Sequence, residues 1–119
     1  MHALTGIVGR EGKILLPDLK PAQIKNSVRD ALGHVKVVSG PDDPEIDPWW
    51  GEPGLTLAEK VFGWNTFEVL SFITGDPEKP QNAVPPFAEA ICQIRFVVDT
   101  DPDVFLPTIR EHLAANGYG

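Results

Sequence analysis

The sequence carries little positive charge and a single cysteine. Ten Lys and Arg residues stand against 17 Asp and Glu residues, which gives a formal net charge of -7. Nucleic acid is therefore not an expected partner, because phosphate backbones bind basic surfaces. The one cysteine, Cys92, excludes an internal disulfide and favours a reducing, cytoplasmic compartment.

Long apolar runs are also missing from the chain. None approaches the roughly 20 residues that cross a bilayer, and the N-terminus lacks a basic segment followed by an apolar one. No membrane partner is expected. With 119 residues, of which 42% are hydrophobic and 23% charged, the chain fits one globular domain. Twelve prolines and 11 glycines indicate much irregular chain within it.

Complete catalytic motifs are absent as well. There is no Gly-rich phosphate loop, no Gly-x-Ser-x-Gly and no His-Glu-x-x-His. His2, His34 and His112 lack metal-ligand spacing and are expected to be solvated. Cys92 falls on the predicted core face of a strand, where an inert buried thiol is expected. Neither a catalytic residue nor a metal ligand is therefore assigned to this chain.

The first half of the chain alternates short apolar segments with turns. Apolar positions at helical spacing predict the tail of a helix in residues 2–8, so the chain is expected to begin inside an element. Residues 12–17 predict an edge strand or an extended arm. Helices are predicted over residues 21–32, with Gly33 ending the first, and over residues 55–62.

A proline-rich loop is predicted over residues 39–54. It contains the pair Trp49-Trp50, for which two readings stay open. Exposed paired indoles favour an interface, whereas packing against the sheet would explain them without a partner. The acidic pairs of this loop, such as Asp42-Asp43, are expected to be solvated or to cap turns.

Two strands are predicted in the second half. In residues 66–74, Phe67, Val69 and Ile73 are expected to share one face. Residues 75–86 form a polar, proline-rich connection. In the second strand, over residues 87–98, the even positions are apolar and are expected to face the core; they are Ala88, Ala90, Cys92, Ile94, Phe96 and Val98.

A C-terminal helix is predicted next. Asp101 can cap it, with Pro102 at its first position. Its expected core stripe consists of Leu106, Ile109 and Leu113. Pro107 inside this helix predicts a kink or an unmade backbone bond.

These elements predict an α+β fold with a small antiparallel sheet. Helices are expected to cover one face of the sheet and to leave the other open. A sheet of two or three strands is marginally stable alone, and its unpaired edges invite pairing with a second copy. A homodimer is therefore expected.

Two polar residues are candidates for binding an anion. Asn82 lies in the connection between the strands, and Arg95 is predicted on the wet face of the second strand. An Arg fork matches a carboxylate, and an Asn amide can donate to a carbonyl or oxyanion. The alternative is a loop Asn bonded to its own backbone and a solvated Arg.

The sequence around these residues resembles a known family. Residues 82–86 (NAVPP), followed by Ala88, Ala90 and Ile94-Arg95, are similar to a lid-domain pattern in which an N-x-[IV]-P loop leads into a strand bearing an Arg. The pattern belongs to the zinc metallopeptidase family of acetylornithine deacetylase, succinyl-diaminopimelate desuccinylase and carboxypeptidase G. Residues 2–5 (HALT), 12–17 (GKILLP) and 51–56 (GEPGLT) resemble its dipeptidase-like members. The resemblance spans nearly the whole chain.

The resemblance implies a specific role for residues 1–119. They would form a ferredoxin-like lid, or dimerisation, domain truncated at its first strand. Asn82 and Arg95 would bind substrate, an N-acyl amino acid or small peptide, with the Arg on its carboxylate. Two zinc ions would lie in the parent's catalytic domain, because the family's His-x-Asp and Glu-Glu ligands are absent here. Also absent is the family's His-Ser-Gly stretch, which precedes the first lid helix.

A second class of function stays open beside this one. The chain would then be an independent small α+β binding or dimerisation module without a catalytic parent. Coding sequence flanking this segment discriminates the two, because zinc ligands on both sides would support the lid domain.

Overall fold

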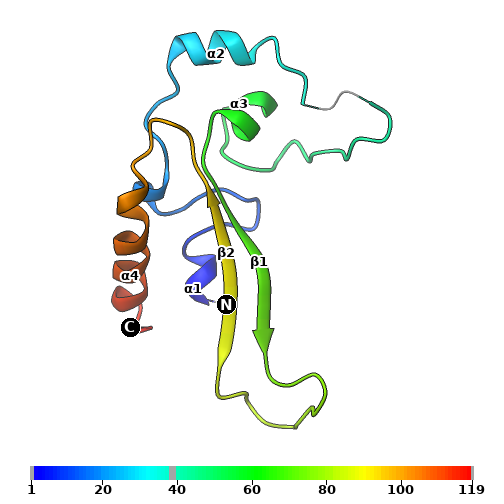
Figure 1. The fold of residues 1–119 in the computed structure, drawn as a ribbon, viewed down its shortest axis with the longest axis vertical. Helices are drawn as coiled ribbons and strands as arrows, with labels where there is room; N and C mark the ends of the chain where they lie inside the picture. The colour runs from blue at the N-terminus through cyan, green and yellow to red at the C-terminus, as the bar shows by residue number, and fades with distance from the viewer. Residues whose placement is uncertain (1, 38–39, 119) are drawn as a thin grey trace.

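The structure, a computed structural model, describes residues 2–37 and 40–118 and has the α+β class expected from the sequence (Figure 1). Two short 3-10 helices, η1 (Pro17–Leu19) and η2 (Pro102–Val104), accompany the main elements. These are α1 (His2–Thr5), α2 (Asn26–Leu32), α3 (Leu57–Phe62), β1 (Thr66–Thr74), β2 (Ala88–Arg95) and α4 (Phe105–Ala115).

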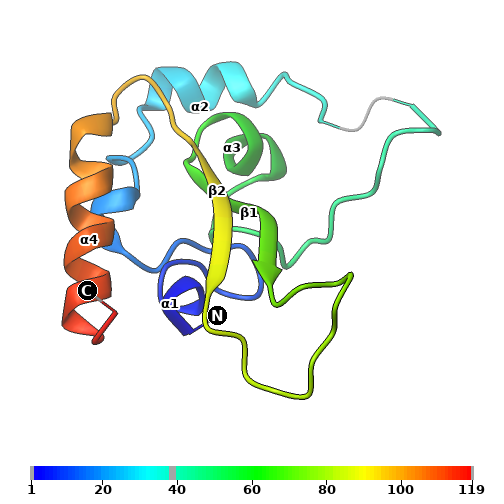
Figure 2. The same cartoon turned by 60° about the horizontal axis from the view of Figure 1, so that its bottom comes forward.

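Strands β1 and β2 form a two-stranded antiparallel ribbon. Thr66 pairs with Arg95 at its base, and Thr74 pairs with Ala88 at its far end. The base joins the helices, while the far end and its connecting loop project beyond α1 and α4 (Figures 1 and 2). The ribbon is therefore anchored at one end only.

The hydrophobic core lies where the N-terminal segment meets the base of the ribbon and the start of α4. Its buried members come from distant parts of the chain and are Ile7, Ile14, Leu19, Phe67 and Phe105. Phe96 meets Phe105 edge to face, with ring centroids 5.4 Å apart. Burial of these side chains is the main stabilising term, since each contributes about 1.5–3 kcal/mol.

Asn65 connects three segments beneath this core. Its side chain is 2% exposed. The amide Nδ2 donates to the Leu19 carbonyl at 2.9 Å and to Thr100 Oγ1 at 3.2 Å, and Oδ1 accepts from the Val97 backbone N–H at 3.0 Å. A buried amide is stable only when its polar groups are bonded, so Asn65 fixes the start of β1 against η1 and the turn after β2.

The N-terminal segment is helical only as far as Thr5. Val8 instead forms an isolated antiparallel bridge with Ile14, which makes residues 8–14 a small hairpin and confirms the extended arm. Gly12 has a φ of +82°, and a Cβ there would meet Trp50 Nε1 at 2.6 Å. Trp50 thus packs on this hairpin, whereas the packing interpretation had expected the sheet, and Trp49 stays 62% exposed.

The proline-rich loop is irregular over residues 40–54, as expected, and residue 39 lies outside the described residues. Helix α3 follows it and has a capping box. Thr56 Oγ1 accepts from the Glu59 N–H, and Glu59 Oε2 accepts from the Thr56 N–H. The buried Glu59 also pairs with Arg29 Nε of α2 at 2.8 Å.

The predicted helix over residues 21–32 is shorter than expected. It begins at Asn26, although Gly33 follows its end as predicted. Ile24 is buried ahead of the helix beside Gly63, where an added Cβ would meet Ile24 Cδ1 at 3.4 Å. Tertiary packing of Ile24 thus outweighs its place in the helical pattern, and Val28, from the expected core face, is exposed.

A β-bulge changes the predicted face of β1. Val69 pairs with Cys92 and Ser71 with Ile91, so Leu70 has no partner in the register. Beyond the bulge Phe72 pairs with Ala90, two residues from Cys92 on β2. Phe72 therefore continues the face of Val69, and the prediction that Ile73 shares that face is wrong, because one extra residue reverses the alternation.

The predicted core face of β2 is largely solvent-exposed. Ile94 packs against the core, but Ala88, Ala90 and Cys92 are exposed, and so are Phe96 and Val98. The even positions of β2 do share one face, as predicted. However, no described residue covers that face on the projecting part of the ribbon. Cys92 is therefore not the buried thiol that its position predicted.

Helix α4 accommodates its proline without a kink. Asp101 Oδ1 accepts from the Asp103 N–H, and Pro102 opens η2, as predicted for the cap. Helix α4 itself begins at Phe105, so Pro107 lies in its first turn, where N–H groups have no intrahelical acceptor. The predicted defect is wrong for that reason. Phe105 is buried in place of the exposed Leu106.

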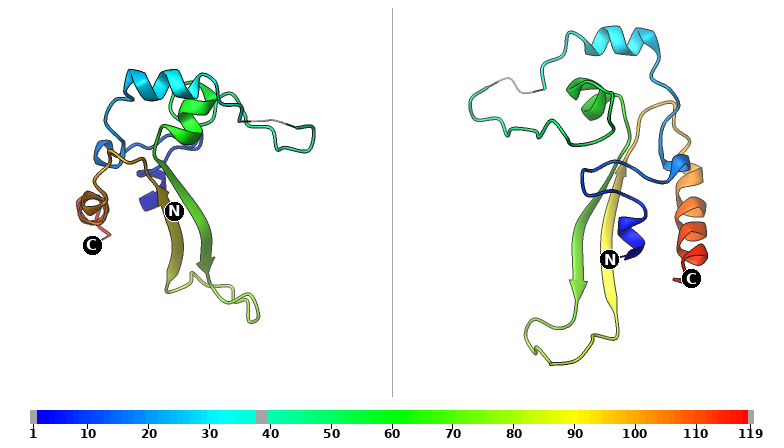
Figure 3. Two further views of the ribbon diagram at one scale, coloured as in Figure 1. Left: turned by 45° about the horizontal axis from the view of Figure 1, so that its top comes forward. Right: turned by 180° about the vertical axis from the view of Figure 1, so that it is seen from behind.

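The molecule is extended for its size. Its radius of gyration is 17.3 Å, whereas a compact chain of this length has about 13.5 Å. Its accessible surface is 8758 Å², whereas a compact 13 kDa monomer exposes about 6,300 Å². The ribbon and the proline-rich loop, both of which project from the body, account for this form (Figure 3).

Candidate functional site

Arg95 lies at the base of the ribbon on its polar face. Its Nη2 pairs with Glu68 Oε1 at 2.7 Å, and its Nε donates to Thr66 Oγ1 at 3.2 Å. The side chain is nevertheless 55% exposed, so its remaining N–H groups are accessible to a ligand or a partner.

A cavity of about 390 Å³ opens beside Arg95. Its lining combines this guanidinium with two carboxylates, an indole and two aliphatic side chains, from Glu45, Ile46, Asp47, Trp50 and Val61. Glu68 also pairs with Arg95, so the carboxylates around this guanidinium outnumber the one cationic side chain of the cavity. An anion bound here must therefore compete with the carboxylates that surround Arg95.

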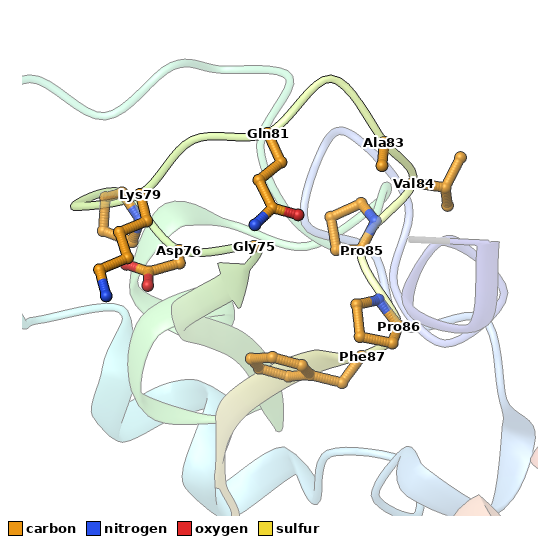
Figure 4. A pocket seen from close by; sticks show the side chains of 10 residues that line it. Gly75, Asp76, Lys79, Gln81, Ala83, Val84, Pro85, Pro86 and Phe87 are labelled. Carbon is orange, nitrogen blue, oxygen red and sulfur yellow. The ribbon is translucent and has the colours of Figure 1, made fainter.

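Asn82 lies in the exposed loop between the strands. That loop encloses a cavity of about 410 Å³ lined only by its own residues, among them Asp76, Lys79 and Gln81 (Figure 4). Gln81 points into the loop, whereas Val84 points away from it and is 93% exposed. Asn82 itself does not line the cavity.

The structure does not bring Asn82 and Arg95 together within one chain. Arg95 is at the base of the ribbon, and Asn82 follows its far end (Figures 1 and 3). The length of β2 alone separates them by about 23 Å, at roughly 3.3 Å per residue. A site that uses both residues on one small ligand thus needs more than this chain.

The histidines differ in their surroundings. His2 and His34 are exposed, as expected. His112 is partly buried and its Nε2 lies 3.0 Å from the Ala3 carbonyl, so it joins α4 to α1 and the prediction of a solvated side chain is wrong. Across residues 2–37 and 40–118, no three His, Cys, Asp or Glu side chains are placed to hold a metal ion.

The strongest feature that sequence reasoning missed is an apolar surface on the projecting half of the ribbon. We call it the ribbon patch, and it consists of Val69, Leu70, Phe72, Ile73 and Ile91, all exposed. Val69 and Phe72 lie on one face of the ribbon, and Ile73 and Ile91 lie on the other. The strand pattern had assigned part of this set to the core. The signal that could have revealed the patch is the absence of a further predicted strand or helix to cover both faces.

Cys92 follows Ile91 on β2 and pairs with Val69 of β1. Partial burial raises the pKa of its thiol above the usual value, because desolvation disfavours the thiolate. Cys92 is therefore accessible but not activated as a nucleophile.

No family model, curated protein or solved structure matches this chain. Within the described part of the chain, no helix is long and apolar enough to span a bilayer.

Proposed function

We propose that this chain is the dimerisation and substrate-binding lid domain of a cytoplasmic, zinc-dependent aminoacyl or peptide amidohydrolase. The resemblance of residues 82–95 to the lid pattern of that family motivates the assignment. The two zinc ions would be held by the parent's catalytic domain, and no step of catalysis is assigned to residues of this chain.

The observation that carries the proposal is the ribbon patch. Exposed apolar surfaces mark interaction sites, and here apolar side chains are exposed on both faces of the ribbon. Here the exposed residues lie on a two-stranded ribbon that is marginally stable without further partners. A lid domain would use this ribbon against its copy in a second subunit.

The substrate-binding part rests on Arg95 and Asn82. Arg95 is exposed on the polar face and retains N–H groups beyond those that meet Glu68 and Thr66. Asn82 is exposed on the loop at the other end of the ribbon. Because one chain keeps them apart, we infer that they act together only in the assembled parent, or that one of them binds substrate alone.

The test is replacement of Arg95 in the full-length parent enzyme. Loss of a charge-assisted contact to a substrate carboxylate costs about 1.5–3 kcal/mol, so Arg95→Ala should lower kcat/KM about tenfold to a hundredfold. Arg95→Lys should recover only part, because a point charge cannot reproduce the fork.

The control is the same substrate amidated at its carboxylate. Only the free acid should lose efficiency if Arg95 binds that group. Equal losses on both substrates would make Arg95 structural, through its contact with Glu68, and no loss on either would remove it from the site.

A further inference from the structure

The cavity beside Arg95 has walls that are anchored to the body of the molecule. One wall is the part of the proline-rich loop that leads back to α3, and another is α3 itself (Figure 1). Lys60 of α3 is 9% exposed, and its Nζ donates to the Pro48 carbonyl at 3.1 Å. The Gly51 N–H donates to the Glu11 carbonyl at 2.6 Å. These contacts hold the loop against both α3 and the N-terminal hairpin, so the lining of the cavity has a fixed position.

Part of the Arg95 guanidinium is unused in this cavity. Thr66 accepts from Nε and Glu68 accepts from Nη2, which orients the side chain. Among the described residues Nη1 has no hydrogen-bond partner. Because the guanidinium can bind a carboxylate through its two Nη groups, Arg95 can bind an anionic group and still keep its ion pair with Glu68.

The carboxylates of the cavity lack partners of their own. Glu45 and Asp47 line it, and neither side chain makes a hydrogen bond or ion pair with residues 2–37 or 40–118. Glu68 already offsets the charge of Arg95. A ligand that carries only a carboxylate would therefore be repelled by two unpaired carboxylates as it approaches Arg95. A ligand that also carries a positive charge would pair with them.

We propose that Glu45 and Asp47 form an ammonium subsite, so that the cavity takes a small zwitterion. The ammonium of the ligand pairs with these two carboxylates, while its own carboxylate binds Arg95. The inference deepens the substrate-binding half of the proposed function and rests on it for the role of Arg95. It selects a substrate with a free amino group over an N-acyl amino acid.

The rest of the lining fits the body of such a ligand. Ile46 and Val61 offer aliphatic contacts, and the Trp50 indole offers an apolar face that also attracts an ammonium group. The volume of about 390 Å³ is at the low end of the range of about 300–1,000 Å³ for small-molecule sites. A sphere of this volume is about 9 Å across, and an extended dipeptide is about 7 Å long, at about 3.3–3.6 Å per residue. An apolar dipeptide with free ends is therefore a suitable ligand for the test.

Three matched compounds test the two charges separately. Leucyl-leucine carries both charges, leucyl-leucine amide lacks the carboxylate, and 4-methylpentanoyl-leucine has a hydrogen in place of the ammonium. Binding to the chain is measured by NMR titration of the Trp50 indole N–H signal, which is assigned by its loss in Trp50→Phe. We expect both analogues to bind about tenfold or more weakly than leucyl-leucine, because each loses a charge-assisted contact.

Removal of the two carboxylates should reverse this preference. Glu45→Gln combined with Asp47→Asn should weaken the binding of leucyl-leucine about tenfold and strengthen that of 4-methylpentanoyl-leucine, because the repulsion is lost. The control combines Asp30→Asn with Asp42→Asn, which changes the net charge equally at exposed carboxylates outside the cavity. It should alter either affinity by no more than about twofold, since salt screens distant charges. Equal effects of the two double variants would overturn the subsite. Circular dichroism verifies that both are folded.

The outcomes separate this inference from the role of Arg95. Equal affinities for leucyl-leucine and 4-methylpentanoyl-leucine would overturn the ammonium subsite and leave Arg95 as a carboxylate site. Equal affinities for leucyl-leucine and its amide would overturn the zwitterion together with the carboxylate-binding role of Arg95, and would make the cavity a site for organic cations. Absence of binding by all three at millimolar concentration would overturn the inference, whereas kcat/KM of the Arg95 variants in the parent would still decide the proposed function.

Discussion

At the scale of single residues, Gly6 determines how closely α4 approaches α1. A Cβ built on Gly6 would meet His112 Cε1 at 2.5 Å, although the backbone of Gly6 does not require glycine. The hydrogen bond between His112 and the Ala3 carbonyl holds the imidazole in that position. The absence of a side chain at residue 6 thus permits the contact between the first and last helices.

We therefore predict that Gly6→Ala destabilises the fold by about 1–3 kcal/mol, the usual cost of overpacking. In a His112→Ala background the same change should be neutral or stabilising, because Ala restricts the unfolded chain more than Gly does. Urea denaturation of the four proteins of this cycle measures the coupling. Additive effects of the two substitutions would show that Gly6 and His112 do not interact.

Cys92 provides a prediction about pH. Only the thiolate is nucleophilic, and partial burial raises the pKa of this thiol. At pH 8, alkylation of Cys92 by iodoacetamide should therefore be slower than that of a free cysteine derivative, and the difference should shrink as the pH rises through the raised pKa. Mass spectrometry of the alkylated fraction, at a concentration where the chain is monomeric, is the measurement. A rate at pH 8 above that of the free thiol would contradict it.

At the scale of elements, local signals predicted some boundaries closely and others poorly. The strand over residues 66–74 and the loop after it agree with the sequence pattern, because β-branched and aromatic alternation ends at Gly75 and a proline-rich run. The start of α2 does not, because burial of Ile24 outweighs helical spacing. The bulge at Leu70 has no local signature, and it reversed the predicted face beyond it.

The candidate site was predictable as a set of residues but not as an arrangement. Spacing placed Arg95 on the polar face of its strand, where the structure has it, beside Glu68. Asn82 lies in the loop before the start of β2, whereas Arg95 is the last residue of β2. The length of β2 therefore separates the two residues. The ion pair between Arg95 and Glu68 depends on the register of β2 against β1, and the pattern of a single strand does not specify that register.

Helix α3 offers a prediction at this scale, because it is only six residues long and depends on its cap. Thr56→Ala should destabilise the fold by about 1 kcal/mol, the usual cost of losing an N-cap hydroxyl. Thr56→Ser keeps the acceptor for the Glu59 N–H and should cost little. Thermal unfolding of the two variants and of the unchanged chain measures both losses of stability. Equal losses for Ser and Ala would show that the methyl group of Thr56 stabilises the fold rather than its oxygen.

At the scale of the whole molecule, a small core supports a large surface. The core unites the N-terminal hairpin, the base of the ribbon and α4, while the far half of the ribbon makes no contribution to it. The free energy that folds the helices is therefore separate from the free energy that would order the projecting strands. On the proposed function, association with a second copy would supply the latter.

Stability should accordingly depend on protein concentration. If folding is coupled to dimerisation, each tenfold increase in concentration adds about 1.4 kcal/mol to the free energy of unfolding the dimer. Unfolding two small chains has a urea dependence of about 2–6 kcal/mol/M, so the urea midpoint should rise by about 0.2–0.7 M per tenfold in concentration. A midpoint that stays constant from micromolar to millimolar protein would mean that the ribbon is stable in the monomer, and that its exposed apolar residues serve a partner other than a second copy.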